Sequence, residues 1–185
     1  MRLVMLGGSG SGRGTQSQLL CDALKTPWIS SGELLRLAIA SRSSLGKTVA
    51  ASVKQGELVP DEVMIELVSQ RLSQPDAADG WMLDGYPCTA FQAEELSFLL
   101  DRINQKLDWA IWLDVPREVL VQRSMERSRS DDTPEAIQRR IDLLYERTVP
   151  ILDYYDYRGR LVKVNGAQPI DSVQQDIRQA IGADS

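Results

Sequence analysis

A glycine-rich loop, "GGSGSGRGT" (7–15), is the feature that most constrains the fold of this chain. It follows the short apolar run "RLVML" (2–6) and opens a segment of helical character, an order typical of a phosphate-binding loop. Such a loop directs backbone N–H groups toward the helix N-terminus, where an anion binds. The pattern departs from G-x-x-x-x-G-K-S/T at Arg13, which stands where lysine is usual, and by a glycine before Thr15. A glycine-rich turn without a ligand is the alternative, but the strand-to-helix context favours a phosphate site.

Short apolar runs alternate along the chain with longer segments of helical period. The runs lie at residues 2–6, 28–30, 81–85, 107–115 and 160–164. Because such an alternation is typical of βαβ units, the predicted fold is α/β, a buried parallel sheet with helices on both faces. Ser30 with Glu33, and Asp or Thr before Pro134, predict two helix starts. Two apolar helix faces are expected, one with Leu96, Leu99, Leu100 and Ile103, the other with Ile137, Ile141, Leu144 and Tyr145.

The composition restricts the class of function. A chain of 185 residues with 43% hydrophobic content is expected to form one domain, 1–185. The net charge of −5 without a basic cluster argues against nucleic-acid or membrane partners, and the start "MRLVML" has no signal-peptide pattern, so we expect a cytoplasmic protein with small-molecule partners. The two cysteines are expected to be reduced. Because the chain has no histidine, catalysis by histidine and metal ligation by histidine are excluded.

One carboxylate and a group of arginines are candidates for handling phosphate charge. Asp84 ends the apolar run "WMLD", a position from which it can hold Mg2+ through water near the glycine loop, and Thr15 is a candidate to support the metal or the β-phosphate. The alternative for Asp84 is a turn cap. The arginines neutralise charge on transferring phosphoryl oxygens without any proton-transfer group. Each arginine alone fits a surface charge as well as a catalytic role. The set is Arg123, Arg127, Arg129 and Arg140.

Five stretches in register resemble the adenylate kinase family over essentially the whole chain. They are "GGSGSGRGTQ", "ISSGELLR", "GELVPDE", "LDGYPCTAFQAEEL" and "DDTPEAIQRRI". The resemblance implies a P-loop nucleoside monophosphate kinase fold with a five-stranded parallel sheet, a monophosphate-binding insert at 30–59 and a very short lid at 126–132. It implies reversible transfer from Mg-ATP to AMP giving two ADP, with Mg2+ as cofactor, nucleotide partners ATP, ADP and AMP, and a monomeric protein.

The resemblance also implies roles for individual residues. Those assigned to catalysis are Arg13, Asp84, Arg127, Arg129 and Arg140, with no direct protein ligand to the metal. Those assigned to ATP are Gly10, Ser11, Gly12, Arg13, Gly14, Thr15, Arg123, Arg127 and Gln168, the last through its backbone. Those assigned to AMP are Ser31, Arg36, Glu57, Leu58, Val59, Gly85, Tyr86, Pro87, Cys88, Gln92, Arg129 and Arg140. Gln92 matches the residue that reads adenine, with an exposed polar residue as the alternative.

Three positions depart from the family pattern, and all concern phosphate. Arg13 replaces lysine, Ser9 replaces proline, and Cys88 replaces the arginine that grips the AMP phosphate. Because Arg13 keeps a positive charge, its exchange is expected to affect the rate, whereas Cys88 is expected to weaken AMP binding, with nearly additive effects. Arg36 alone, or Arg42 moving in, would then hold the acceptor phosphate.

Two other functions are consistent with the same residues. One is a catalytically weakened nucleotide-binding protein with a sensor or partner role, which the departures at Arg13 and Cys88 favour. The other is a kinase for CMP or UMP. The complete set of Asp84, Arg127, Arg129 and Arg140 favours an active kinase, and Gln92 favours adenine.

Overall fold

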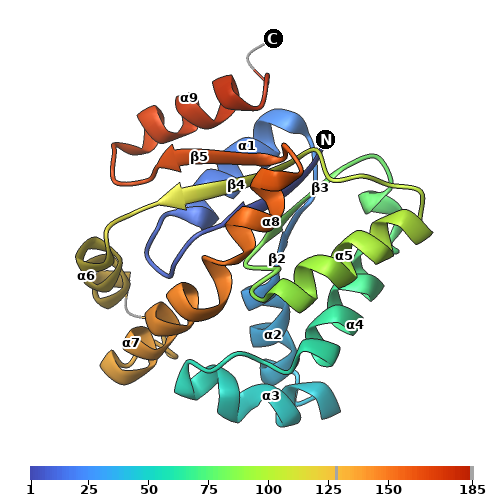
Figure 1. Cartoon of the computed structure of the whole chain (residues 1–185). Helices are drawn as coiled ribbons and strands as arrows, with labels where there is room; N and C mark the ends of the chain where they lie inside the picture. The colour runs from blue at the N-terminus through green and yellow to red at the C-terminus, as the bar shows by residue number, and fades with distance from the viewer. Residues whose placement is uncertain (128, 184–185) are drawn as a thin grey trace.

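A five-stranded parallel sheet forms the centre of the molecule. The structure is a computed structural model that describes residues 1–127 and 129–183. The strand order is β2-β3-β1-β4-β5, so β1 lies in the middle and pairs with β3 and β4 (Figure 1). The predicted α/β class is therefore confirmed. The bounds are β1 Arg2–Leu6, β2 Trp28–Ser30, β3 Trp81–Asp84, β4 Trp109–Asp114 and β5 Leu161–Asn165.

Helices connect the strands and cover both faces of the sheet (Figure 1). The first half of the chain contributes α1 Arg13–Leu24, α2 Ser31–Ala40, α3 Ser44–Gln55, α4 Asp61–Leu72, the 3-10 turn η1 Pro75–Ala77 and α5 Ala90–Arg102. The second half contributes α6 Arg117–Arg127, α7 Pro134–Leu143, the π-helical turn η2 Leu144–Thr148, α8 Ile151–Tyr157 and α9 Ile170–Ala180. In the part of the chain that the structure describes, no helix has the length and apolarity needed to cross a membrane.

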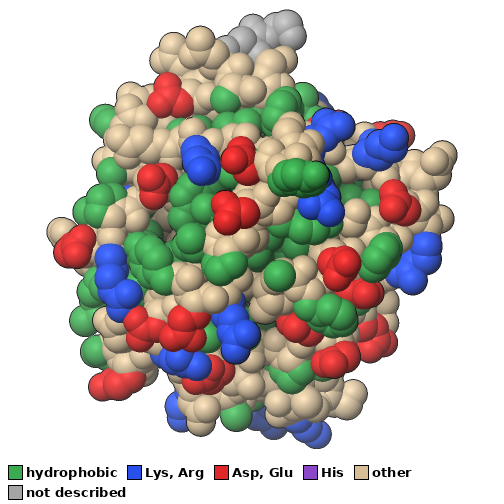
Figure 2. Space-filling model, viewed as in Figure 1, with side chains coloured by type: hydrophobic (Ala, Val, Ile, Leu, Met, Phe, Trp, Pro, Cys, Tyr) green, Lys and Arg blue, Asp and Glu red, His purple; other side chains and the backbone are tan. Residues whose placement is uncertain are grey.

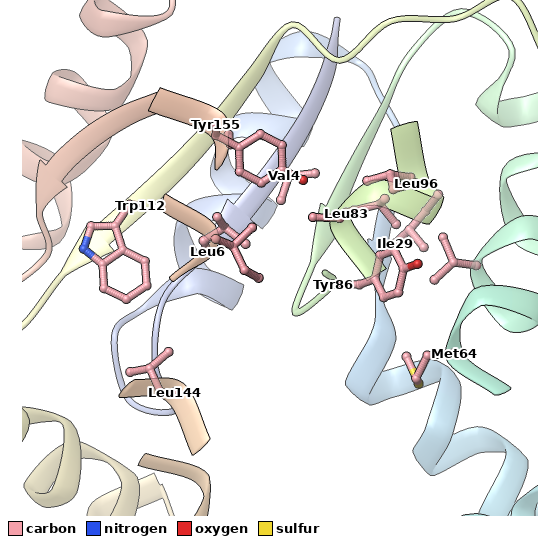
Figure 3. Close-up of a cluster of buried hydrophobic side chains, with 14 of the residues drawn as sticks. Val4, Leu6, Ile29, Met64, Leu83, Tyr86, Leu96, Trp112, Leu144 and Tyr155 are labelled. Carbon is pink, nitrogen blue, oxygen red and sulfur yellow. The ribbon is translucent and has the colours of Figure 1, made fainter. Parts of the chain in front are cut away.

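The central strand shows why the apolar runs are continuous rather than alternating. Successive side chains of a strand point to opposite faces, and both faces of this sheet are covered. Val4 and Leu6 therefore pack in one core with α5 and α8, whereas Leu3 and Met5 pack in a second core with α1 and α9. Figure 3 shows the first of these cores, in which Val4, Leu6, Leu83 and Tyr155 gather beneath the helices.

Both predicted helix starts are confirmed by their caps. The Ser30 hydroxyl accepts the backbone N–H of Glu33 at 3.4 Å, and the Thr133 hydroxyl accepts that of Ala136 at 3.2 Å. An N-cap of this kind typically contributes about 1 kcal/mol. Because α2 starts directly after β2, the cap at Ser30 places the first turn of this helix at the carboxyl edge of the sheet.

One expected core residue is exposed instead. Ile137, Ile141 and Leu144 are buried as predicted, but the side chain of Tyr145 is 41% exposed and lies under the Arg117 guanidinium, 5.6 Å from the ring centre. The reason is the π-helical turn η2, in which the hydrogen bonds span five residues rather than four. This widened turn rotates Tyr145 off the face that the 3.6-residue period predicts.

Candidate active site

A cleft of about 440 Å3 lies where the carboxyl ends of the parallel strands meet the helices around them. This edge is where ligands bind in open α/β sheets. The cleft contains nearly all of the residues that the sequence assigns to nucleotides. Those that line it are Gly10, Gly12, Arg13, Gly14, Thr15, Ser31, Arg36, Glu57, Leu58, Val59, Asp84, Gly85, Pro87, Cys88, Gln92, Arg123, Arg127, Arg129 and Arg140.

Three assigned residues are not part of the lining. Ser11 is buried within the glycine loop, and the Tyr86 ring is buried in the core, with its hydroxyl donating to the Gln92 carbonyl at 3.3 Å. Gln168 is half-buried and donates from Nε2 to Asn165 O and to Asp176. Near Gln168, Arg123 donates to the Gly166 carbonyl at 3.0 Å, which places the Arg123 guanidinium beside this segment.

The glycine loop has a backbone that only glycine adopts without strain. Gly10 has φ +85° and Gly12 has φ +92°, both in the left-handed region. A side chain at Gly10 would also meet the Leu120 carbonyl at 2.5 Å, so α6 packs directly against the loop. Helix α1 begins immediately afterwards, without an acidic residue in its first turn. The loop therefore presents the positive end of a helix to the cleft.

Asp84 lies at the end of β3 beneath the glycine loop. Its side chain is 9% exposed, and its Oδ1 lies 3.4 Å from Arg13 Nε, an ion pair without hydrogen-bond geometry. Among the described residues, no donor bonds this oxygen. A buried carboxylate oxygen with spare acceptor capacity suits a hydrated cation, because Mg2+ keeps several waters and uses few protein carboxylates.

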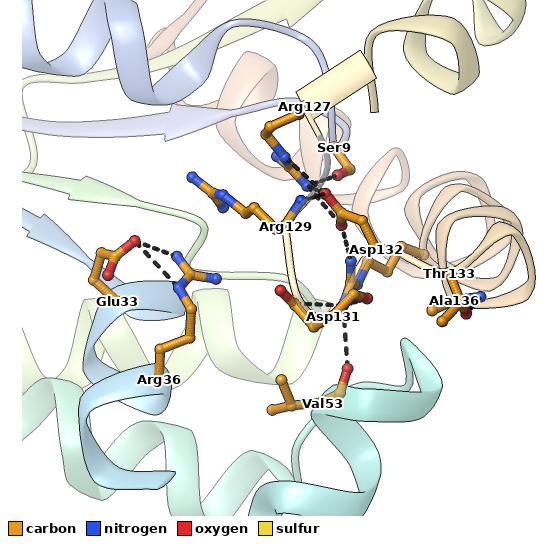
Figure 4. A network of polar contacts seen from close by, with 11 residues as sticks. Ser9, Glu33, Arg36, Val53, Arg127, Arg129, Asp131, Asp132, Thr133 and Ala136 are labelled. Carbon is orange, nitrogen blue, oxygen red and sulfur yellow. Dashed lines mark hydrogen bonds and ion pairs between the residues drawn. The ribbon is translucent and has the colours of Figure 1, made fainter. Parts of the chain in front are cut away.

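Asp132 joins two of the predicted catalytic arginines (Figure 4). Its fully buried carboxylate accepts from Arg127 at 2.9 Å and from Arg140 at 2.7 Å. Arg127 Nη2 also donates to Ser9 Oγ at 3.0 Å. A proline at position 9 has no side-chain acceptor for this hydrogen bond. These contacts hold two guanidinium groups in fixed positions on one carboxylate, with Arg127 against the glycine loop.

Arg140 has further contacts that tie three elements together. Its Nη2 donates to Asp131 at 2.7 Å and to the Val53 carbonyl at the end of α3 at 3.1 Å. The loop before α7 and helix α3 thus meet at this guanidinium.

Arg129 extends from the loop between α6 and α7 toward α2, where Arg36 and Glu33 lie (Figure 4). Burial lowers the pKa of Arg129, and the positive charges of Arg127 and Arg36 lower it further. Like charges held this close are stabilised by an anion between them. The predicted lid, 126–132, includes Ser128, which lies outside the described residues.

Another part of the cleft wall is built around Gln92. Its side chain is buried, so it is not the exposed polar residue of the alternative interpretation. Gln92 Oε1 accepts the Cys88 N–H, and Nε2 donates to Asp61 Oδ1, both at 2.7 Å. The Thr89 hydroxyl accepts the Gln92 backbone N–H as the N-cap of α5 and also donates to Asp61 Oδ1. Because an amide has two donor hydrogens and two acceptor sites on oxygen, one of each remains for a ligand.

Cys88 lies in the same turn. Its thiol donates to the Gly85 carbonyl at 3.1 Å, and burial raises its pKa. The Ser31 hydroxyl donates to the same carbonyl at 2.9 Å. Of the two arginines expected to compensate, Arg36 lines the cleft and donates twice to Glu33, whereas Arg42 is exposed in the turn after α2 and does not line it.

Sequence reasoning missed the partners that position these groups. Asp61 orients Gln92, Asp132 holds two arginines, and Ser9 receives Arg127. The acidic pair "DD" (131–132) in a segment rich in arginine was the one available signal, because buried guanidinium groups require carboxylate partners. Asp61 carries no such signal, since an acidic residue in the first turn of a helix is ordinary.

The fold and the cleft define a P-loop kinase of small nucleotides, in which one phosphate loop faces a second binding wall. Residues 5–160 match the family described as adenylate kinase. The chain is 58% identical over 177 residues to adenylate kinase 2 of Nostoc sp., with 96% of each chain covered. It is 51% identical to adenylate kinase 2 of Synechocystis sp., covering 94% of this chain and 96% of that one. It is 42% identical to an adenylate kinase of Xanthomonas campestris, covering 98% and 100%.

The chain belongs to the adenylate kinase family. It is accordingly an enzyme, a phosphotransferase of the adenylate kinase type.

Proposed function

We propose that the enzyme transfers the terminal phosphoryl group of Mg-ATP reversibly to AMP, giving two ADP. The observation that carries the proposal is that Arg127, Arg129 and Arg140 line one cleft together with the glycine loop and Gln92. A site for each nucleotide on either side of a cationic centre suits transfer between two phosphates.

On the donor side, the loop Gly10–Thr15 receives the ATP phosphates through its backbone N–H groups. Arg13 carries charge at the start of α1, and Arg123 packs on the adenine, next to the backbone of Gln168. The contact of Arg123 with Gly166 supports this placement, because it brings the guanidinium to the segment that contains Gln168.

In the transfer step, a phosphate oxygen of AMP attacks the γ-phosphorus while the bond to the β–γ bridging oxygen breaks and ADP leaves. Charge spreads over the equatorial oxygens, so fixed cations lower the barrier. Arg127, Arg129 and Arg140 supply them. Asp132 keeps two of these guanidinium groups oriented before substrate binds, which reduces the reorganisation required.

Asp84 and Thr15 fit a hydrated Mg2+ at the donor phosphates. The buried Asp84 oxygen without a hydrogen-bond donor supports this assignment. When bound, the metal neutralises phosphate charge and orients the transferring group. Arg13 lies beside the same carboxylate, with its Nε 3.4 Å from Asp84 Oδ1.

On the acceptor side, Gln92 reads adenine through its remaining donor and acceptor. Ser31, Arg36, Gly85, Tyr86, Pro87 and Cys88 surround the monophosphate together with the segment Glu57–Val59. Tyr86 contributes through the backbone, because its ring is buried. The orientation of Gln92 by Asp61 supports a reading role, since a fixed amide discriminates one base edge from another.

The helix pair α2–α3 lies within the proposed monophosphate-binding insert 30–59, and residues 126–132 act as a short lid. Arg140 supports this pairing, since its Nη2 donates both to Val53 in the insert and to Asp131 in the segment 126–132. We infer a monomer acting in the cytoplasm. On the face in Figure 2, acidic and basic side chains are interspersed, which fits a protein without a nucleic-acid partner.

A panel of acceptors tests the proposal. Purified protein is assayed with Mg-ATP and AMP, CMP, UMP or GMP, with ADP formation followed by a coupled reaction. AMP is expected to give the highest kcat/KM. A faster reaction with CMP or UMP would overturn the adenine assignment of Gln92. Binding of ATP and AMP with no turnover of any acceptor would overturn the reaction itself.

A further inference from the structure

The Arg13 side chain extends from the glycine loop toward Asp84 and Gly85. Its Nε lies 3.4 Å from Asp84, and its Nη1 and Nη2 lie 3.6 and 3.8 Å from the point where a Cβ on Gly85 would stand. Gly85 is the first residue of the turn whose carbonyl accepts from both Ser31 and Cys88. The guanidinium therefore lies against the turn that forms the acceptor wall.

Two small residues in this turn leave space for the guanidinium. Gly85 has φ +80°, and a side chain there would meet Ser31 Oγ at 2.8 Å and face Arg13. Cys88 is short and turns its thiol toward the Gly85 carbonyl. An arginine at position 88 would bring a second guanidinium to the same turn, where like charges repel. Among the charges near Cys88, that of Arg13 has the largest effect on the thiol and lowers its pKa.

Two other cations that line the cleft, Arg36 and Arg140, already have partners. Arg36 donates to Glu33 at 2.6 and 3.2 Å, and Arg140 bonds Asp131 and Asp132. Arg13 has only the ion pair with Asp84, without hydrogen-bond geometry, among the described residues. Its planar fork of five donors is thus available to two anions at once, which the single ammonium of lysine serves less well.

We propose that Arg13 binds the phosphate of the acceptor nucleotide as well as the donor phosphates, and that Arg13 and Cys88 form a coupled pair in which one guanidinium serves both subsites. The proposal rests on the proposed function, which supplies the acceptor. It replaces the sequence expectation that Arg13 and Cys88 act on separate substrates. Losing a contact that Arg13 makes to the acceptor phosphate in both ground state and transition state lowers the affinity for AMP. Losing its alignment of the donor phosphates lowers kcat.

The test is a double-mutant cycle of Arg13→Lys, Cys88→Arg and the double variant, with the affinity for AMP alone measured by titration calorimetry and KM and kcat by steady-state kinetics. Arg13→Lys is expected to weaken AMP binding about tenfold. Cys88→Arg is expected to give no tighter AMP binding while Arg13 is present, because the two guanidinium groups repel. In the double variant, the guanidinium introduced by Cys88→Arg is expected to restore AMP affinity, so the two effects differ from additivity about tenfold or more.

Controls separate this coupling from damage to the fold. Arg71→Lys makes the same exchange in α4, where Arg71 pairs with the exposed Asp76 outside the cleft, and is expected to leave AMP affinity unchanged. Cys88→Ser tests removal of the thiol without adding charge. If Cys88→Arg does not fold, Cys88→Lys replaces it in the cycle, with the same expected pattern.

Additive effects, or an Arg13→Lys variant that loses ATP affinity and keeps AMP affinity, would overturn the proposal. Calorimetry with AMP alone measures acceptor binding without turnover, so a failure of this proposal can be told apart from a failure of the proposed function. Loss of AMP affinity in Arg13→Lys supports the proposal even if AMP is a poor acceptor in turnover. Preserved AMP affinity in that variant sinks it even if AMP is the best acceptor.

Discussion

Asp132 and Arg140 form an ion pair of 2.7 Å in which the carboxylate is fully buried. The same carboxylate binds Arg127, so one acid holds two cations, of which Arg127 also contacts Ser9 of the glycine loop. The arginines proposed to meet the phosphoryl group are therefore oriented by contacts within the protein. This preorganisation makes the arginines testable one at a time.

Arg127→Ala and Arg140→Ala are each expected to lower kcat about a hundredfold, the scale on which a fixed transition-state donor acts. The measurement is the coupled assay with Mg-ATP and AMP. Arg158→Ala, which removes an exposed arginine stacked on Tyr154 outside the cleft, is the matched control and is expected to keep kcat within about twofold. Near-normal turnover in Arg140→Ala would show that its role is only to hold Val53 and the acidic pair.

Gln92→Leu is expected to raise KM for AMP about tenfold or more and to reduce the preference for AMP over CMP. The substitution removes the amide proposed to read the base and leaves the Cys88 backbone N–H without its acceptor, while Asp61 Oδ1 keeps its donor from Thr89. An unsatisfied partner of this kind costs about 1–3 kcal/mol, so urea denaturation is expected to show a parallel loss of stability. Unchanged acceptor preference in a folded variant would remove Gln92 from base recognition.

The two thiols are expected to react slowly with iodoacetamide at pH 8. Burial raises the pKa of Cys21 from 9.0 to about 11, and burial also raises that of Cys88. At pH 8 the thiolate fraction of Cys21 is then about one in a thousand, against about one in ten for a thiol of pKa 9. Because both folded pKa values lie above the unfolded ones, the neutral thiols are favoured in the fold, and this contribution to stability is lost as pH rises above about 9.

Mass spectrometry of the alkylated peptides measures these rates. AMP is expected to slow the modification of Cys88 further and to leave Cys21 unaffected, since only Cys88 lines the cleft. Equal protection of both thiols by AMP would indicate general stabilisation rather than occupancy of the acceptor wall.

Leu83→Ala is expected to destabilise the protein by about 2–5 kcal/mol. Leu83 is fully buried in β3, paired in register with Val4 and Ile29, and its loss leaves a cavity under the strand that ends at Asp84. Leu37→Ala on α2 is the control, because this leucine is 64% exposed and its removal is expected to cost less than about 0.5 kcal/mol. Equal midpoints in urea for the two variants would contradict the described core.

The sequence by itself determines the α/β class, the five strands to within a few residues, the helix caps at Ser30 and Thr133, and the glycine loop. These depend on local rules: period, turn chemistry and the conformational freedom of glycine. The parallel sheet then brings the strand ends together, which places the glycine loop and Asp84 in one cleft, whereas Gln92 was assigned to it by the resemblance to the adenylate kinase family.

Only the tertiary structure decides which side chains meet within that cleft. Arg140 bonds Val53, Gln92 bonds Asp61, and Arg13 reaches the Gly85 turn, contacts between segments far apart in the chain. The choice among several possible carboxylate and carbonyl partners depends on packing distances of a few ångströms, which no local pattern encodes. Tyr145 also lies off its predicted face, because the π-helical turn Leu144–Thr148 departs from the 3.6-residue period.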